Sequence, residues 1–159
     1  MAFDEFLQQR IFEPLGMPDT DFWVPPEKAS RFITQYSPTD LFDPMKPGLV
    51  KVDDPVTGQY NKKRALLSGG GGLVSTVADY VKFLQMIVGG GERQGVRLLK
   101  AATLELMRTN QLAKGVSVAF PMWAMPGTTF GLGFALKESL QEHEPASAQG
   151  EYHLSLIHI

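Results

Sequence analysis

The stretch Leu67-Ser-Gly-Gly-Gly-Gly-Leu-Val-Ser-Thr-Val-Ala-Asp-Tyr-Val-Lys-Phe83 carries the clearest local signal in this 159-residue chain. Within it, Thr76 and Asp79 have the spacing of a capping box, with Asp in the place of Glu or Gln. Apolar residues then recur at helical spacing until Gly89–Gly91, at Val77, Tyr80, Val81, Leu84, Ile87 and Val88. The pattern predicts a glycine loop that leads into a capped helix with one apolar face.

The first fifteen residues are also helical by their spacing. Their apolar residues fall on one stripe, at Phe3, Phe6, Leu7, Ile11 and Phe12. Pro14 and Gly16 predict that this helix ends around residues 12–15, because proline disfavours a continuing helix and glycine supplies a C-terminal cap. No capping residue precedes the stripe, which favours a chain that begins inside a domain.

Between residues 18 and 67 no hydrophobic period is sustained, and seven prolines break the pattern. Runs at 31–36 and 48–52 are candidate brief strands, and a structureless stretch of this length indicates a functional loop region. Further along, a second helix is predicted over about 100–110, with Leu104, Leu106 and Met107 inward. The run Phe130-Gly-Leu-Gly-Phe-Ala-Leu-Lys137 has strand character, and its glycines predict a bulge or a close backbone approach.

Composition excludes several classes of protein. With 15 Lys+Arg against 17 Asp+Glu the net charge is −2, which gives no basic face for a nucleic-acid partner. No apolar run approaches the roughly 20 residues of a membrane span, and the N-terminus does not have the pattern of a signal peptide. The absence of cysteine excludes a disulfide scaffold and thiolate metal sites but leaves the compartment unknown.

The chemistry-bearing residues predict no cofactor and no metal. The glycine run lacks the Gly-Lys-Ser/Thr of a phosphate loop, so nucleotide binding is disfavoured. The histidines are His143, His153 and His158, and none has a second ligand at helical spacing. Asp53 and Asp54 lie in a proline-bounded loop, where solvated charge is the default. Trp23 and Trp123 are interpreted as packing residues.

No complete catalytic apparatus is found either. There is no Gly-x-Ser-x-Gly elbow, and none of the eight serines has a lysine three positions later. We therefore assign no catalytic residue to this chain.

Three stretches together resemble the serine β-lactamase-like hydrolases. Phe3–Thr20 is similar to the family's helix and its "PLGM-x-x-T" turn, and Leu67–Phe83 to its glycine loop and following helix. Gly131-Leu-Gly-Phe134, followed by Gly150-Glu-Tyr152, is similar to its "GLGF … G-x-Y" stretch. The resemblance covers roughly residues 2–153 and is closest to the β-lactamase-like carboxylesterases, with class C β-lactamases and D-amino-acid peptidases as relatives.

The resemblance implies an α+β, β-lactamase/transpeptidase-like fold, of which this chain carries mostly the helical lobe and one or two strands. In that family a serine of Ser-x-x-Lys attacks an ester or amide carbonyl, and a tyrosine helps to move its proton. The family places both motifs upstream of Met1, so the resemblance transfers neither to a residue here. It implies that Gly70, Gly71 and Gly72 border the acyl pocket and bind substrate.

We therefore expect residues 1–153 to be part of a serine hydrolase domain and residues 154–159 to be a non-native tail, with a natural C-terminal strand as the alternative because the run is apolar and β-prone. The parent protein is expected to hydrolyse a small-molecule ester, without nucleic acid or a membrane span, and this fragment is expected to be inactive. Alternatives are hydrolysis of a β-lactam or D-amino-acid amide, a parent that is itself inactive, and a non-catalytic binding module.

Overall fold

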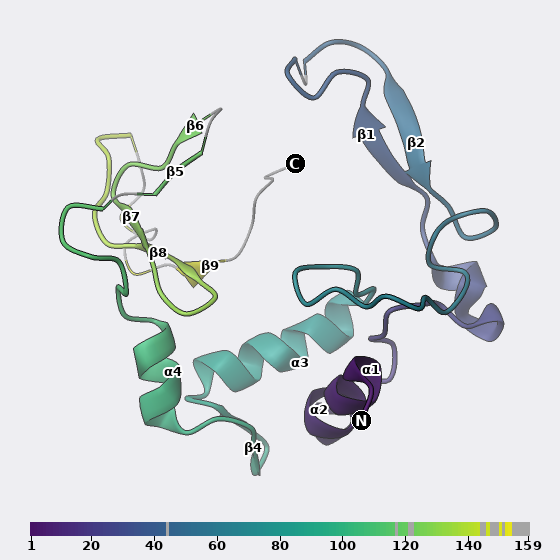
Figure 1. Cartoon of the computed structure of the whole chain (residues 1–159), viewed down its shortest axis with the longest axis horizontal. Coiled ribbons are helices and arrows are strands. Elements are labelled where there is room, and N and C mark those ends of the chain that lie inside the picture. The colour runs from purple at the N-terminus through teal and green to yellow at the C-terminus, as the bar shows by residue number, and fades with distance from the viewer. Residues whose placement is uncertain are drawn as a thin grey trace. The chain divides into compact units, whose positions relative to one another are not determined.

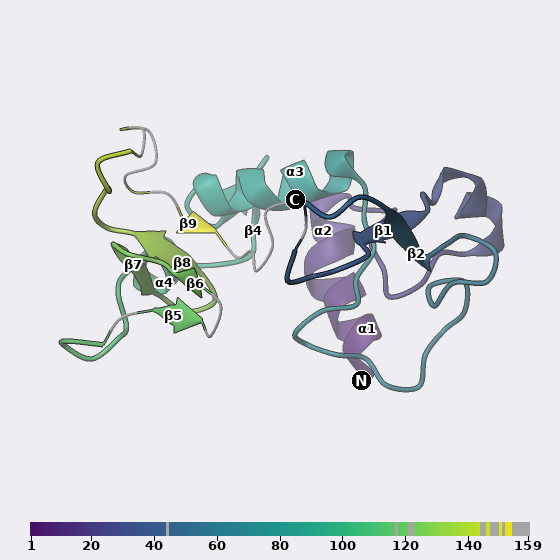
Figure 2. The same cartoon turned by 90° about the horizontal axis from the view of Figure 1, so that it is seen from above.

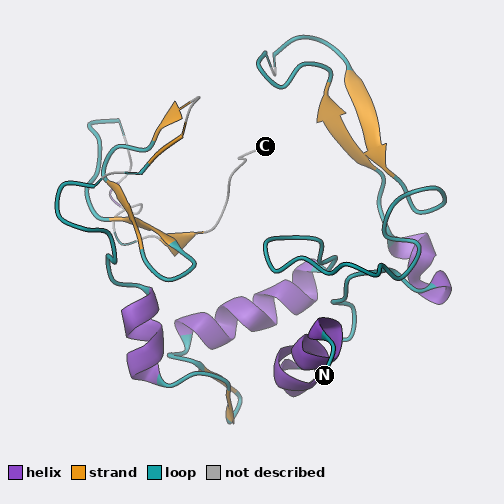
Figure 3. Ribbon diagram, in the orientation of Figure 1, coloured by secondary structure: helices purple, strands orange, loops and turns teal. Residues whose placement is uncertain are grey.

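The computed structural model describes residues 1–43, 45–116, 118–120, 123–143, 146, 150 and 152–153 (Figure 1). Contacts divide the chain into two compact units, Met1–Gln85 and Met86–Ile159, and helix α3 (Val77–Val88) continues across the boundary. Both units mix helices with short strands (Figure 3), which confirms the expected α+β composition. The predicted tail, residues 154–159, lies outside the described residues.

The first unit begins with a helix in three parts: α1 (Phe3–Leu7), η1 (Gln8–Phe12) and α2 (Glu13–Leu15). Figure 2 shows these parts as one continuous helix. The η1 segment is π-helical, and the Glu13 N–H donates to the carbonyl of Gln8. Pro14 explains this wider turn, because proline has no N–H and its ring crowds the carbonyl four residues earlier. The helix that the apolar spacing predicts is confirmed.

The same helix ends at Gly16, as its sequence predicts. Gly16 has φ of +69°, and its N–H donates to the carbonyl of Glu13 at 3.0 Å. The Met17 N–H donates to the carbonyl of Phe12 at 2.8 Å. These two bonds form a Schellman motif, which requires a left-handed residue that glycine supplies at little steric cost.

A hairpin follows a 3-10 helix, η2 (Pro26–Arg31). Its strands are β1 (Gln35–Pro38) and β2 (Leu49–Asp53), which pair antiparallel with Tyr36 opposite Lys51. Both predicted brief strands are therefore present, although β1 begins near the end of the predicted run. The pairing could not be read from periodicity because both strands are short and only Asp53 within β2 is buried.

The loop after β2 corrects one expectation, because Asp53 and Asp54 are buried rather than solvated (4% and 8% exposed). Asp54 accepts hydrogen bonds from the backbone N–H and the hydroxyl of Thr57, at 2.8 and 2.7 Å, and pairs with Lys51 at 2.9 Å. These bonds hold the pKa of Asp54 well below its usual range. The two carboxylates therefore organise their own loop, in the manner of Asx turns.

The predicted apolar face of α3 is largely exposed, and that of the N-terminal helix is exposed in part. On the N-terminal helix Phe12 is buried, whereas Phe3 and Phe6 are exposed. On α3, Ile87 is buried together with its neighbour Met86. The other members of the predicted α3 face are exposed, namely Val77, Tyr80, Val81, Leu84 and Val88. Helical spacing therefore predicts the helices correctly. The described residues cover the N-terminal face only in part, where Phe3 packs on Phe22 at 5.7 Å between ring centroids, and they leave most of the α3 face exposed.

In the second unit, a short hairpin of β3 (Glu92–Arg93) and β4 (Val96–Arg97) precedes α4 (Ala101–Met107). The predicted second helix is thus confirmed over a shorter range. Leu104 is fully buried, but the inward prediction is wrong for Leu106, which is exposed. Leu106 lies about 200° around the helix from Leu104, so a segment that covers Leu104 leaves Leu106 on the opposite side.

The remaining strands are very short. β5 (Ala119–Phe120) pairs with β6 (Trp123–Ala124), and β7 (Thr128–Phe130), β8 (Ala135–Lys137) and β9 (Tyr152–His153) form an antiparallel sheet in that order. The apolar run at 130–137 is therefore a hairpin rather than one strand. A Cβ at Gly131 would lie 2.0 Å from the carbonyl oxygen of Met107, which confirms the predicted close backbone approach.

Each unit has its own small group of buried apolar residues. They are Phe12, Leu15, Met17 and Phe22 in the first unit, and Met86, Ile87, Leu104, Ala135 and Leu136 in the second. Across the described part of the chain, none of the helices has the length and apolar character to cross a membrane.

Candidate functional site

A buried carboxylate joins the turn after α2 to the first turn of α3. Asp79 is 2% exposed, and its Oδ2 accepts hydrogen bonds from the backbone N–H of Asp19 at 2.7 Å and the hydroxyl of Thr20 at 3.3 Å. Its Oδ1 lies 3.0 Å from Nζ of Lys82. A carboxylate this buried is tolerated only when donors surround it, so the bonds fix residues 19–20 against α3.

The capping box predicted at the start of α3 is formed in one direction. The hydroxyl of Thr76 accepts the Asp79 N–H at 3.2 Å, as an N-cap should. The Asp79 carboxylate, expected to return to the backbone of the cap, binds the turn at Asp19 and Thr20 instead. One aspartate thus serves both the helix and a tertiary contact.

The C-terminal end of the glycine loop is attached to the same turn at two further points. Thr20 and Ser75 share a hydrogen bond between their hydroxyls at 2.7 Å. Asp21 and Val74 form an antiparallel bridge, with N–H···O distances of 3.1 and 2.8 Å. Consequently the last residues of the loop are held rigidly, while its glycines project beyond these anchors.

The glycines themselves differ in what the backbone requires of them. Gly72 has φ of +108°, and a Cβ there would lie 3.7 Å from the ring of Phe22. At Gly71 a Cβ would meet nothing within 4 Å, and at Gly70 only the hydroxyl oxygen of Ser68 at 3.8 Å. All three are exposed. The tight turn therefore requires Gly72 alone, and the loop leaves open space beside Gly70 and Gly71.

The other residues singled out in the sequence do not gather at this loop. His143 is exposed, and in the described part of the chain no group of three potential ligands is placed to hold a metal. His158 and the side chains of His153 and Trp123 lie outside the described residues. Trp23 is half-buried, with Nζ of Lys63 5.4 Å from its ring centroid.

Sequence reasoning missed the roles of Asp19 and Thr20. Two hydrogen bonds join Asp19 to Arg31 at 2.6 and 2.8 Å, and a 2.8 Å ion pair joins it to Lys28. These partners, Arg31 first, hold the pKa of Asp19 well below its usual range. The "PLGM-x-x-T" turn, whose last residue is Thr20, pointed to this part of the chain. The neighbouring sequence does not show, however, that Thr20 bonds to Ser75 and Asp79.

Residues 1–154 match the protein family described as Beta-lactamase, and the chain belongs to this family. It is 29% identical over 150 residues to protein Rv1367c of Mycobacterium tuberculosis strain H37Rv, and equally to the uncharacterised protein MT1414 of strain CDC 1551. These alignments cover 92% of this chain and 35% of each relative. The chain therefore spans about a third of the length of the curated relatives it matches.

Solved structures share the fold. The octameric penicillin-binding protein homologue from Pyrococcus abyssi matches with a TM-score of 0.57 and 23% identity, over 87% of this chain and 26% of its own. Simvastatin synthase (LovD) from Aspergillus terreus matches with a TM-score of 0.63 and 23% identity, over 87% of this chain and 34% of its own. EstCE1, a hydrolase with promiscuous acyltransferase activity, matches with a TM-score of 0.62 and 20% identity, over 86% of this chain and 35% of its own. The fold is thus the β-lactamase/transpeptidase-like fold that the three motifs imply.

Proposed function

We propose that this chain forms part of a serine hydrolase that cleaves a small ester through a covalent acyl-enzyme. The single observation that carries the proposal is the family match over residues 1–154. One structural neighbour, EstCE1, is a hydrolase with promiscuous acyltransferase activity, which supports acyl transfer as the chemistry. In such a reaction a nucleophile takes the acyl group from the ester and water then releases it.

The nucleophile belongs, in this proposal, to a part of the protein outside this chain. None of the eight serines is followed three residues later by lysine, so none has the partner that would activate it. The exposed apolar faces of α3 and the N-terminal helix support a larger fold, because Tyr80, Leu84 and Phe6 are 53%, 42% and 46% exposed. Residues 1–153 would then contribute helices and loops around a site that is completed elsewhere.

Gly70, Gly71 and Gly72 are proposed to border the acyl pocket. Their geometry supports this role. The space beside Gly70 and Gly71 is open, and neither residue has a positive φ that would by itself require glycine. Anchoring of Val74 and Ser75 to the turn at Thr20 and Asp21 would hold the loop in a fixed position beside the substrate. A rigid element with small residues suits a wall that an acyl chain approaches closely.

Activity measurements test the proposal. The chain extended upstream, with the Ser-x-x-Lys and tyrosine that we expect there, should hydrolyse p-nitrophenyl butyrate with a burst of nitrophenol, and replacing that serine by alanine should abolish the burst. The chain alone should not exceed an inert-protein control. Turnover by the chain alone, with an acyl group on one of its own serines, would overturn the proposal.

The alternatives give different results in the same assays. Preferential hydrolysis of a chromogenic cephalosporin, or of a D-amino-acid amide, would favour the amide-cleaving relatives. An upstream sequence without Ser-x-x-Lys, joined to a domain of the same fold, would favour an inactive parent. A protease-resistant, cooperatively unfolding chain with no upstream coding sequence would favour a self-sufficient binding module.

A further inference from the structure

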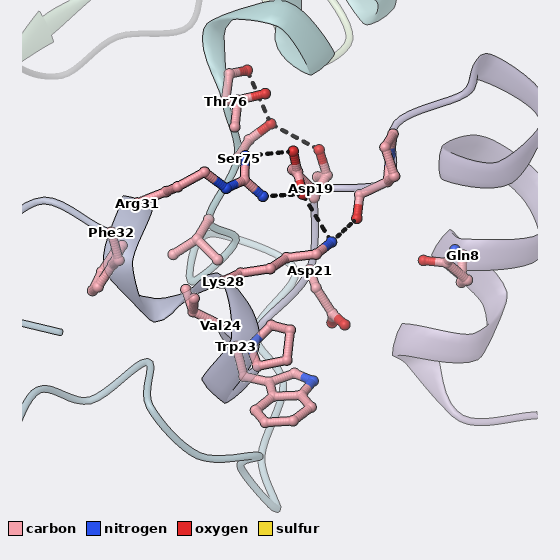
Figure 4. A pocket seen from close by; sticks show the side chains of 14 residues that line it. Gln8, Asp19, Asp21, Trp23, Val24, Lys28, Arg31, Phe32, Ser75 and Thr76 are labelled. Carbon is pink, nitrogen blue, oxygen red and sulfur yellow. Dashed lines mark hydrogen bonds and ion pairs between the residues drawn. The ribbon is translucent and has the colours of Figure 1, made fainter. Parts of the chain in front are cut away.

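A concave site lies within the first unit, lined by the turn after α2, by helix η2 and by residues 74–76, which lead into α3 (Figure 4). The cavity has a volume of about 260 Å³. Typical pockets for drug-sized ligands measure roughly 300–1,000 Å³, so this one is suited to a smaller molecule. Its lining includes the charged residues Asp19, Lys28 and Arg31 and the apolar or aromatic residues Trp23, Val24 and Phe32. Gly70, Gly71 and Gly72 are not part of its lining.

Two cations at this cavity share one carboxylate. Arg31 donates to both oxygens of Asp19, at 2.6 and 2.8 Å, and Nζ of Lys28 lies 2.8 Å from the same carboxylate. Asp21 also lines the cavity, but its Oδ1 accepts the N–H of Phe22 at 2.6 Å. No ion pair in the described part of the chain joins Asp21 to either cation. Lys28 and Arg31 together carry one positive charge more than the Asp19 carboxylate that they bind, and the carboxylates of Asp21 and Asp79 nearby offset part of this excess.

These cations have donors to spare. An ammonium has three N–H bonds, and Lys28 uses two, one to Asp19 and one to the carbonyl of Pro18 at 2.6 Å. A guanidinium has five, and Arg31 uses two on Asp19. The side chains of Lys28 and Arg31 remain 32% and 54% exposed. A second anion can thus reach both residues without first breaking the Asp19 contacts.

Besides polar residues such as Gln8 and Thr76, the lining includes the apolar or aromatic side chains of Trp23, Val24 and Phe32. Figure 4 shows the Trp23 ring below Lys28, with Val24 near both and Phe32 beyond Arg31. Such surfaces accept a short hydrocarbon body, whereas inorganic phosphate would leave them unfilled. A ligand that matches both parts of the lining has one anionic group and a small apolar body.

We propose that this pocket binds a small organic monocarboxylate, with its carboxylate on Lys28 and Arg31 and its alkyl or aryl part against Trp23 and Val24. Planar guanidinium favours carboxylate, because two parallel N–H···O bonds match its geometry. The negative charge of Asp19 lowers the positive potential at these cations, so it weakens the binding of a second anion even though it leaves the spare donors free. The proposal goes beyond ester hydrolysis, although a carboxylic acid is also what ester hydrolysis releases.

Fluorescence titration of the full chain tests this site. A Trp123→Phe background leaves Trp23 as the sole tryptophan, and butanoate is compared with neutral butanamide at constant ionic strength. We expect saturable binding of butanoate in the millimolar range and none of butanamide. Arg31→Gln should weaken binding about tenfold, since it removes a charged hydrogen-bond donor. Asp19→Asn should strengthen it several-fold, because the negative charge of Asp19 is lost.

Arg64→Gln is the matched control, since Arg64 is exposed, bonds to Gln59 and does not line the pocket. Equal responses to butanoate and butanamide, or unchanged binding by Arg31→Gln, overturn the proposal. Equal or weaker binding by a folded Asp19→Asn variant also overturns it. If the circular dichroism spectrum shows that Asp19→Asn is not folded like the parent, the Arg31→Gln variant and the comparison of butanoate with butanamide test the proposal instead.

Discussion

The Asp79 carboxylate accepts a hydrogen bond at 2.7 Å from the backbone N–H of Asp19, which lies 60 residues earlier in the chain. This contact joins two of the three motifs by which the family is recognised, the turn that ends at Thr20 and the glycine loop with its helix. The motifs are separate in sequence but meet in the structure. Their shared role is to hold the end of the glycine loop, at Val74 and Ser75, in one position.

Replacing Asp79 by asparagine should destabilise the first unit. The side chain is 2% exposed and accepts hydrogen bonds from Asp19 and Thr20, and bonds to charged groups contribute about 1.5–3 kcal/mol each. We expect the free energy of unfolding in urea to fall by about 2 kcal/mol. Asp43→Asn, at an exposed position, is the control and should change it little. Equal effects of the two substitutions would show that the buried network contributes nothing.

The glycines of the loop should respond differently to alanine. Gly72 has φ of +108°, a conformation that costs an L-residue roughly 1–2 kcal/mol, so Gly72→Ala should lower the stability by that amount. Gly71→Ala should leave stability unchanged, because its Cβ meets nothing within 4 Å. In the longer enzyme that we propose, Gly71→Val should instead reduce kcat/KM for bulky acyl esters more than for acetyl esters. A uniform loss on all esters would argue against a place beside the acyl group.

In the second unit, Gly131→Ala should be strongly destabilising. The added methyl group would lie 2.0 Å from the carbonyl oxygen of Met107, so the β7–β8 hairpin would have to move away from α4. Overpacking of this kind costs about 1–3 kcal/mol. Thermal unfolding followed by circular dichroism measures the change, with Gly69→Ala as the control because its Cβ has open space. An unshifted transition in Gly131→Ala would mean that the close approach does not form in solution.

Acid should weaken the ion cluster around Asp19. Its pKa in the folded chain lies below the ordinary value of 3.8, chiefly through the hydrogen bonds from Arg31 and then from Lys28. Stability from such a group is fully present above the unfolded pKa and is lost as the pH falls through the folded one. Between about pH 6 and pH 2.5, the parent should therefore lose more stability than Asp19→Asn. Glu27→Gln, an exposed change on η2, should keep the parent's pH dependence. Parallel curves for the parent and Asp19→Asn would contradict this assignment.

The limits of several helices could be predicted from the sequence, since they depend on residues close together in the chain. Pro14 and Gly16 end the first helix through their own backbone restrictions, and Thr76 begins α3 by capping a nearby N–H. Recognition of the family likewise needed only the order and spacing of three short motifs. These features follow from covalent geometry and from hydrogen bonds within a few residues.

Tertiary structure alone decided which partners the side chains have. Asp79 was expected to complete a local capping box, and Asp53 and Asp54 were expected in solvent, yet all three are buried and hydrogen-bonded. Leu84 shows the opposite outcome, because it lies on an apolar stripe that was expected to be buried but is exposed. Burial depends on which distant segment packs against a residue, and no periodicity within one helix contains that information. The sequence by itself therefore determined the family and the helices. Only the tertiary contacts between distant segments determined how the glycine loop is anchored and which residues line the pocket beside η2.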